Sequence, residues 1–138
     1  MNIGVIIPEI GGYSTLSLEF IKWYHVMQEL GHDVFILAGK SKVTLPNLTI
    51  MADLHPENEF NLNLSSIIFD LRNEDTAELD SIQKLASRLD AFFHSWILNL
   101  NLDIIIVENF FSIPVNLPVS YALHSTFQRV SCKKIIKH

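Results

Sequence analysis

The sequence predicts an α/β domain in which a Rossmann-like, mainly parallel sheet carries helices on both of its faces. Short runs of aliphatic and β-branched residues alternate with long segments whose apolar residues recur at helical spacing. The short runs are continuously apolar rather than alternating, as in strands buried on both faces. A strand–helix–strand order opens the chain and also closes it, which is typical of βαβ units. We expect residues 1–138 to form a single domain, since a chain of 138 residues can bury one sizeable core.

The opening segment is predicted to be a strand followed by a glycine loop. Residues 2–7 form the first apolar run, and Pro8 is expected to end it because proline cannot donate a hydrogen bond to a sheet. Gly11 and Gly12 follow, without side chains to keep another group away from their backbone. With the first turn of the next helix, their amides favour a phosphate or another anion. The alternative, left equally open, is that the two glycines only make a tight turn.

A helix and a second strand complete this unit. Ser14 or Thr15 can cap the helix, whose apolar stripe consists of Leu16, Phe20, Tyr24, Met27 and Leu30. Gly31 stands where a helix usually ends, and residues 33–38 are predicted to be a buried strand. Gly39 follows this strand instead of an acidic residue, and no G-x-G-x-x-G pattern is present. A dinucleotide site of the usual kind is therefore not expected.

The middle of the chain holds one long helix and several shorter segments. Residues 48–51 are predicted to be a short third strand, and residues 52–63 an irregular surface segment. Residues 64–69 fit either a strand or a buried turn of helix. Asn73 can cap a helix over residues 74–98. The apolar stripe of that helix comprises Leu79, Ile82, Leu85, Leu89, Phe92, Phe93 and Trp96.

The last third of the chain is predicted to contain a strand, a helix and a further strand. Residues 103–107 are the clearest buried strand in the sequence, and residues 119–127 form a helix with Pro118 in its first turn. Residues 131–137 are predicted to be the last strand, and the chain stops directly afterwards at His138. Because a parallel strand is normally covered, we expect the sequence to be a truncated part of a longer protein.

Composition excludes several classes of function. Lys and Arg total 10 against 15 Asp and Glu, a net charge of −5, and the basic residues are scattered except for Lys133, Lys134 and Lys137. A nucleic-acid surface is therefore not expected. No apolar segment is long enough to span a bilayer, and the start lacks the basic region of a signal peptide. The single Cys132, expected to be a buried thiol within the last strand, fits a reducing, cytoplasmic compartment.

The apolar content is high for a small domain, with a mean hydropathy of +0.26 and only 18% charged residues. A buried parallel sheet accounts for part of this excess. We expect the rest to lie on a face that packs against something else, either another domain or a second copy of the chain.

Two polar clusters follow predicted buried strands, and they are the candidate site. The first comprises Gly11, Gly12, Tyr13 and Ser14, and the second comprises Glu108, Asn109, Ser112 and Asn116. The carboxyl ends of parallel strands share one edge of a sheet, where ligands bind. Glu108 or Asn109 can hydrogen-bond a sugar hydroxyl or orient a substrate. The alternative reading is that Asn109 caps a turn and that Glu108 is solvated.

No metal or cofactor is expected. The six histidines, His25, His32, His55, His94, His124 and His138, have no metal-ligand spacing. Of these, His138 alone follows a predicted strand, and it is a weak candidate for a catalytic residue at the ligand-binding edge.

Two segments carry a resemblance to a known family. Pro8 and Glu9, then Gly11 and Gly12, then a helix ending in the residues ELGHDV (29–34), resemble the start of glycosyltransferases of the GT-B fold, family 4 (group 1) type. Residues 102–109 and 112–118 are similar to the part of those enzymes where a strand delivers a polar residue to the acceptor cleft. The resemblance covers only the N-terminal domain of such an enzyme.

The resemblance implies an acceptor-binding domain that faces a second domain holding a nucleotide sugar. Gly11 and Gly12 would line the cleft near the donor phosphates, and Glu108 and Asn109 would face the acceptor. Family members often carry a histidine–aspartate pair where this chain reaches His138. Because the donor domain with its paired glutamates is absent, the resemblance implies that the chain is inactive alone, and it implies no metal.

Two other interpretations of the sequence are open. The chain is alternatively a stand-alone Rossmann-like binding or interaction module that self-associates through its apolar surface. The third interpretation is a small nucleotide-dependent enzyme that uses the loop at Gly11 and Gly12.

Overall fold

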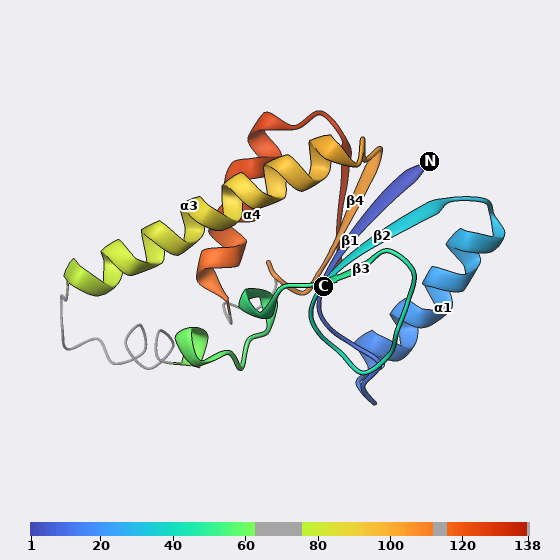
Figure 1. Ribbon diagram of the computed structural model, residues 1–138, viewed down its shortest axis with the longest axis horizontal. Coiled ribbons are helices and arrows are strands. Elements are labelled where there is room, and N and C mark those ends of the chain that lie inside the picture. Colours follow the sequence, from blue (N-terminus) through green and yellow to red (C-terminus); the bar gives the residue numbers. More distant parts are fainter. Residues whose placement is uncertain (63–75, 112–115, 138) are drawn as a thin grey trace.

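The computed structural model describes residues 1–62, 76–111 and 116–137, with the side chains of the long helix described from residue 80 onwards (Figure 1). The strands are β1 (Asn2–Ile10), β2 (Asp33–Ser41), β3 (Leu48–Ile50), β4 (Ile104–Glu108) and β5 (Lys133–Lys137). The helices are α1 (Thr15–Glu29), α3 (Thr76–Asn99), α4 (Leu117–Arg129) and the short 3₁₀ helix η1 (Ala52–Leu54). The predicted segment at 64–69 and the predicted cap Asn73 lie outside the described residues.

All five strands are parallel and lie in the order β3-β2-β1-β4-β5. The central strand β1 pairs with β2 on one side and with β4 on the other; Ile3, for example, lies opposite both Val34 and Ile104. The prediction of a Rossmann-like α/β fold with a parallel sheet is therefore confirmed.

Helices cover both faces of the sheet, as predicted. In Figure 1, α1 lies on one side of the strands, and α3 and α4 lie on the other. Two buried apolar clusters correspond to these layers. On the first face, Ile3, Val5 and Ile7 of β1 pack with Phe20, Tyr24 and Met27 of α1. On the second face, Ile6, Ile105 and Val107 pack with Leu89, Phe93 and Ile97 of α3 and Val119 and Leu123 of α4. Successive strand residues thus enter opposite layers.

The helix ends follow their sequence signals. The Ser14 hydroxyl caps α1 by accepting a hydrogen bond from the Ser17 amide at 3.2 Å. Gly31 takes a positive φ of 78° just after the helix, a conformation that glycine adopts without strain. Asn116 caps α4, and Pro118 lies in its first turn.

The first two strands are longer than predicted. β1 continues through Pro8 to Ile10, so the prediction that Pro8 ends the strand is wrong. The pairing with β4 stops at Ile6, and the pairing with β2 passes over Pro8 before it resumes at Glu9. The missing amide proton of proline therefore breaks no ladder bond.

Gly39 lies opposite Pro8 in this unpaired rung, and it has a packing role. A Cβ atom at this position would lie 2.6 Å from the Pro8 carbonyl oxygen and 2.8 Å from the Cα of His55. The segment that follows η1 thus crosses directly over β2. Residues 52–63 were expected to be irregular, and their described part instead contains η1 and a helical turn at 59–62.

The β5 end of the sheet is less covered than the rest. β5 is an edge strand, and its Ile135 and Ile136 are 45% and 43% exposed. Cys132 lies in a bend before β5 rather than inside the strand as predicted, and burial raises the pKa of its thiol. Among the described residues, no helix is both long and apolar enough to cross a membrane.

Candidate functional site

The carboxyl edge of the sheet brings the two predicted polar clusters to the same side of the molecule. The Gly11–Gly12 loop follows β1, and Glu108 ends β4, which pairs with β1 in parallel. The helices α1 and α4 both begin at this edge. The edge is therefore the candidate ligand site, as the parallel topology predicts.

The glycine loop is built tightly into the fold. Gly11 has a φ of 80°, and its amide donates a 2.6 Å hydrogen bond to the buried hydroxyl of Ser17. A Cβ on Gly11 would lie 2.8 Å from a methyl group of Val43. The Gly11 amide is thus occupied within the chain, so an anion at this loop would depend on other amides. Tyr13, at the tip, is 99% exposed.

Glu9 forms a first charged group beside this loop. Its carboxylate lies 3.4 Å from Nζ of Lys42 and 3.9 Å from Nε2 of His55. A Cβ on Gly12 would lie 3.0 Å from Oε1 of Glu9. Gly12 therefore lies directly against the end of the Glu9 side chain, which is flexible and 29% exposed.

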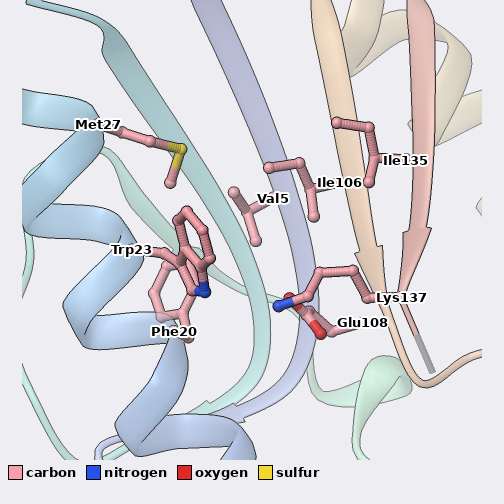
Figure 2. A pocket seen from close by; sticks show the side chains of 8 residues that line it. All are labelled: Val5, Phe20, Trp23, Met27, Ile106, Glu108, Ile135 and Lys137. Atoms are coloured by element: carbon pink, nitrogen blue, oxygen red, sulfur yellow. The ribbon is translucent and has the colours of Figure 1, made fainter. Parts of the chain in front are cut away.

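Glu108 forms a second, more buried group at the end of β4. Its side chain is 4% exposed and lies 3.0 Å from Nζ of Lys137, the last residue of β5 (Figure 2). Nζ of Lys137 also lies 3.4 Å from Oε1 of Glu19 on α1 and 5.8 Å from the ring centre of Trp23. The Trp23 indole donates to Glu19 at 3.2 Å. Glu108 is thus buried and paired, and the reading of it as a solvated side chain is wrong.

These neighbours set the protonation of Lys137. Burial is the largest influence and by itself lowers the pKa of the ammonium. The hydrogen bond and charge of Glu108, followed by those of Glu19, outweigh burial and raise the pKa above its ordinary value. For Glu19, the Trp23 hydrogen bond and then the Lys137 charge lower the pKa. Lys137 is therefore a firmly charged ammonium at neutral pH.

The raised pKa of Lys137 predicts a loss of stability at alkaline pH. A group whose pKa is higher in the folded state contributes its full stabilisation below its unfolded pKa, about 10.4 for lysine, and loses it as the pH rises through the folded value. We expect the free energy of unfolding, measured with urea between neutral pH and about pH 11, to fall more steeply for the native chain than for Lys137→Met. Burial raises the pKa of the Tyr24 hydroxyl. Because Tyr24 is present in both proteins, its titration cancels in the comparison. Lys133→Met, which changes an exposed lysine of the same strand, should keep the native slope. Equal slopes for the native chain and Lys137→Met would contradict the prediction.

The remaining predicted site residues occupy different environments. Asn109 directly follows β4 with a φ of 63°, and its amide extends the β4–β5 ladder by donating to the Lys137 carbonyl at 3.1 Å. Asn116 is 2% exposed; its amide donates to the Asp53 carbonyl at 2.8 Å, and its oxygen accepts from Val119. Asn116 thus ties the start of α4 to η1. Ser112 and His138 lie outside the described residues.

Sequence reasoning missed the partners of the two carboxylates. Lys137 carries a usable signal, because two neighbouring parallel strands that end in Glu and Lys can pair these side chains across the rung. Glu19 and Trp23 are four residues apart on one helix, a spacing at which side chains meet. No local pattern predicts the approach of His55 to Glu9, because it depends on how the segment after η1 crosses β2.

Among the described residues, no group of three or more His, Cys, Asp or Glu side chains is arranged to hold a metal ion. Comparisons with protein-family models, with curated proteins and with solved structures find no match for this chain. The fold and the two charged groups therefore carry the functional argument.

Proposed function

We propose that this chain is the acceptor-binding domain of a nucleotide-sugar-dependent glycosyltransferase of the GT-B kind, in which a second domain holds the donor. One observation carries the proposal: the Gly11–Gly12 loop and the Glu108–Asn109 pair lie at the same carboxyl edge of a parallel sheet. Ligands of open α/β sheets bind at this edge. Pro8, Glu9, Gly11 and Gly12 of the first resembling segment, and Glu108 and Asn109 of the second, lie at this edge.

In this proposal, Glu108 orients the acceptor. A buried carboxylate held by Lys137 can accept a hydrogen bond from a hydroxyl group without first being desolvated, because it is already removed from water. The Gly11 amide is taken by Ser17, which leaves the loop a limited role in phosphate binding. Both features favour an acceptor-binding role over a donor-binding role.

Calorimetric titration with nucleoside diphosphates and nucleotide sugars tests this division of labour. We expect none of them to bind with micromolar affinity, because the donor site belongs to the second domain. Micromolar binding that Gly12→Val abolishes would contradict the proposal and make the chain a nucleotide-binding domain in its own right. Gly31→Ala is the control, since Gly31 lies at the other end of α1, where a Cβ would meet no atom within 4 Å and only the backbone penalty of the positive φ applies.

A second candidate is a self-associating interaction module, and the exposed β5 edge favours it. Ile135 and Ile136 are partly exposed on a strand whose outer edge has no partner in the described part of the chain. Lys133, Lys134 and Lys137 on the same strand oppose direct edge-to-edge pairing. The mass of the protein in solution distinguishes the two candidates. A stable dimer that Ile136→Lys dissociates would favour the interaction module, and a monomer would remove the main support for it.

A further inference from the structure

A pocket of about 190 Å³ lies on the α1 face of the sheet and ends at the Glu108–Lys137 pair. Its walls are the apolar side chains Val5, Phe20, Trp23, Met27, Ile106 and Ile135. Figure 2 shows Phe20, Trp23 and Met27 on α1 opposite Val5, Ile106 and Ile135 on three strands. The pocket is therefore a gap between one helix and the part of the sheet that this helix does not cover.

The size of the pocket limits its occupant to about one ring. An apolar protein cavity of about 150 Å³ is large enough for benzene, and this pocket is somewhat larger at about 190 Å³. It also opens to solvent, since Trp23 and Ile135 are 53% and 45% exposed. A single ring with a short substituent can enter and bury its surface against the indole and the strand side chains.

The polar end of the pocket selects the charge of the ligand. Glu108 is paired with Lys137 at 3.0 Å, and Lys137 is also close to Glu19 at 3.4 Å. A charged ligand would have to break this arrangement or be buried beside apolar walls without a partner, and both cost free energy. A neutral ligand avoids that cost.

The same two groups also select the polar atom of the ligand. The Lys137 ammonium is paired with Oε1 of Glu108 and also donates to Glu19, which leaves one of its three donors free. The Glu108 carboxylate has further acceptor sites. A hydroxyl group both donates and accepts, so it can donate to the carboxylate and accept from the ammonium at once.

We propose that this pocket binds a neutral alcohol or phenol built on a single apolar ring, with the hydroxyl group placed between Glu108 and Lys137. The inference deepens the proposed function and rests on it in one respect: it identifies the glycosyl acceptor as a molecule of this class. The binding itself requires neither a donor nor a second domain.

Amide and indole NMR shifts on the full chain test the binding with four probes that share one ring. The probes are benzyl alcohol, toluene, benzylammonium and benzoate, which share a phenyl ring and differ in its single substituent. We expect benzyl alcohol to shift the indole signal of Trp23 and the amide signals of Ile106 and Ile135, with an affinity in the millimolar range. Toluene should bind at least about threefold more weakly because it lacks the hydroxyl, and the two ions about tenfold more weakly. The indole of Trp96, which packs on the opposite face, serves as an internal reference that should not move.

Two neighbouring residues of β5 provide matched variants. Ile135 lines the pocket, whereas Ile136 is similarly exposed and pairs with Val107 on the opposite face of the sheet. Ile135→Trp should fill the pocket and weaken benzyl alcohol binding about tenfold or more, and Ile136→Trp should leave it within about twofold.

The inference is overturned if benzyl alcohol shifts no pocket signal, if an ion binds more tightly than the alcohol, or if both variants weaken binding equally. None of these results touches the proposed function, because an acceptor could still bind at the strand ends. Conversely, micromolar nucleotide binding would overturn the proposed function while the benzyl alcohol result stood.

Discussion

Gly39→Ala is expected to lower the free energy of unfolding by about 3–4 kcal/mol, a large effect for the addition of one methyl group. That methyl group would lie 2.6 Å from the Pro8 carbonyl oxygen and 2.8 Å from the Cα of His55. Both are backbone atoms, so no side-chain rotation relieves the overlap. The strand must move away from the segment after η1, which also separates His55 from Glu9. Urea denaturation of both proteins measures the difference.

Gly31→Ala is the matched control for Gly39→Ala. Gly31 has a φ of 78°, but a Cβ there would have no neighbour within 4 Å. Its expected cost is the backbone penalty alone, about 1–2 kcal/mol. A cost for Gly39→Ala no larger than that for Gly31→Ala would contradict the close crossing of the segment after η1 over β2.

Glu108→Ala is expected to cost about 2 kcal/mol of stability. Breaking a fully buried ion pair costs roughly 3–5 kcal/mol, and an exposed pair about 0–1 kcal/mol. The Glu108 side chain is 4% exposed, but its partner Lys137 is 31% exposed and retains Glu19. Water and Glu19 therefore compensate part of the loss, which places the expected value between the two limits.

Two further variants test how much of this stability loss comes from the buried ion pair. Glu9→Ala removes a carboxylate near the end of the adjacent strand, where the side chains of Glu9 and Lys42 are 29% and 54% exposed, and it should cost less than about 1 kcal/mol. Glu108→Leu combined with Lys137→Met replaces the pair with apolar side chains and should restore stability to within about 1 kcal/mol of the native chain. A small effect of Glu108→Ala, equal to that of Glu9→Ala, would show that the pair contributes no more than a surface contact.

The elements of the fold and the helix ends could be predicted from local patterns, whereas the ends of the first two strands could not. The apolar run at 103–107 and the stripe of Leu89 and Phe93 correspond to β4 and α3, because periodicity reports directly on burial. β1 runs past Pro8 because β4 pairs with it only as far as Ile6. The length of a neighbouring strand depends on the whole sheet, so no local sequence pattern predicts it.

Only the location of the candidate site could be predicted from the sequence. Parallel strands bring their carboxyl ends to one edge, so the presence of Gly12 and Glu108 at the same edge follows from the fold class. The burial of Glu108 depends on α1 and β5 closing around it through Glu19 and Lys137. The pocket beside it arises because α1 leaves part of the sheet uncovered, a result of helix placement that composition shows only as an apolar excess.

In the proposed function, the carboxyl edge around Glu108 binds an acceptor, and a second domain binds the donor. Chemical-shift mapping tests this division with two probes: phenyl β-glucoside, which carries one apolar ring and neutral hydroxyl groups, and UDP-glucose. We expect phenyl β-glucoside to shift the amide signals of Gly12, Glu108 and Lys137, and UDP-glucose to shift none of them. Shifts with UDP-glucose alone, or shifts confined to the opposite edge near Gly31, would show that the carboxyl edge is not an acceptor site.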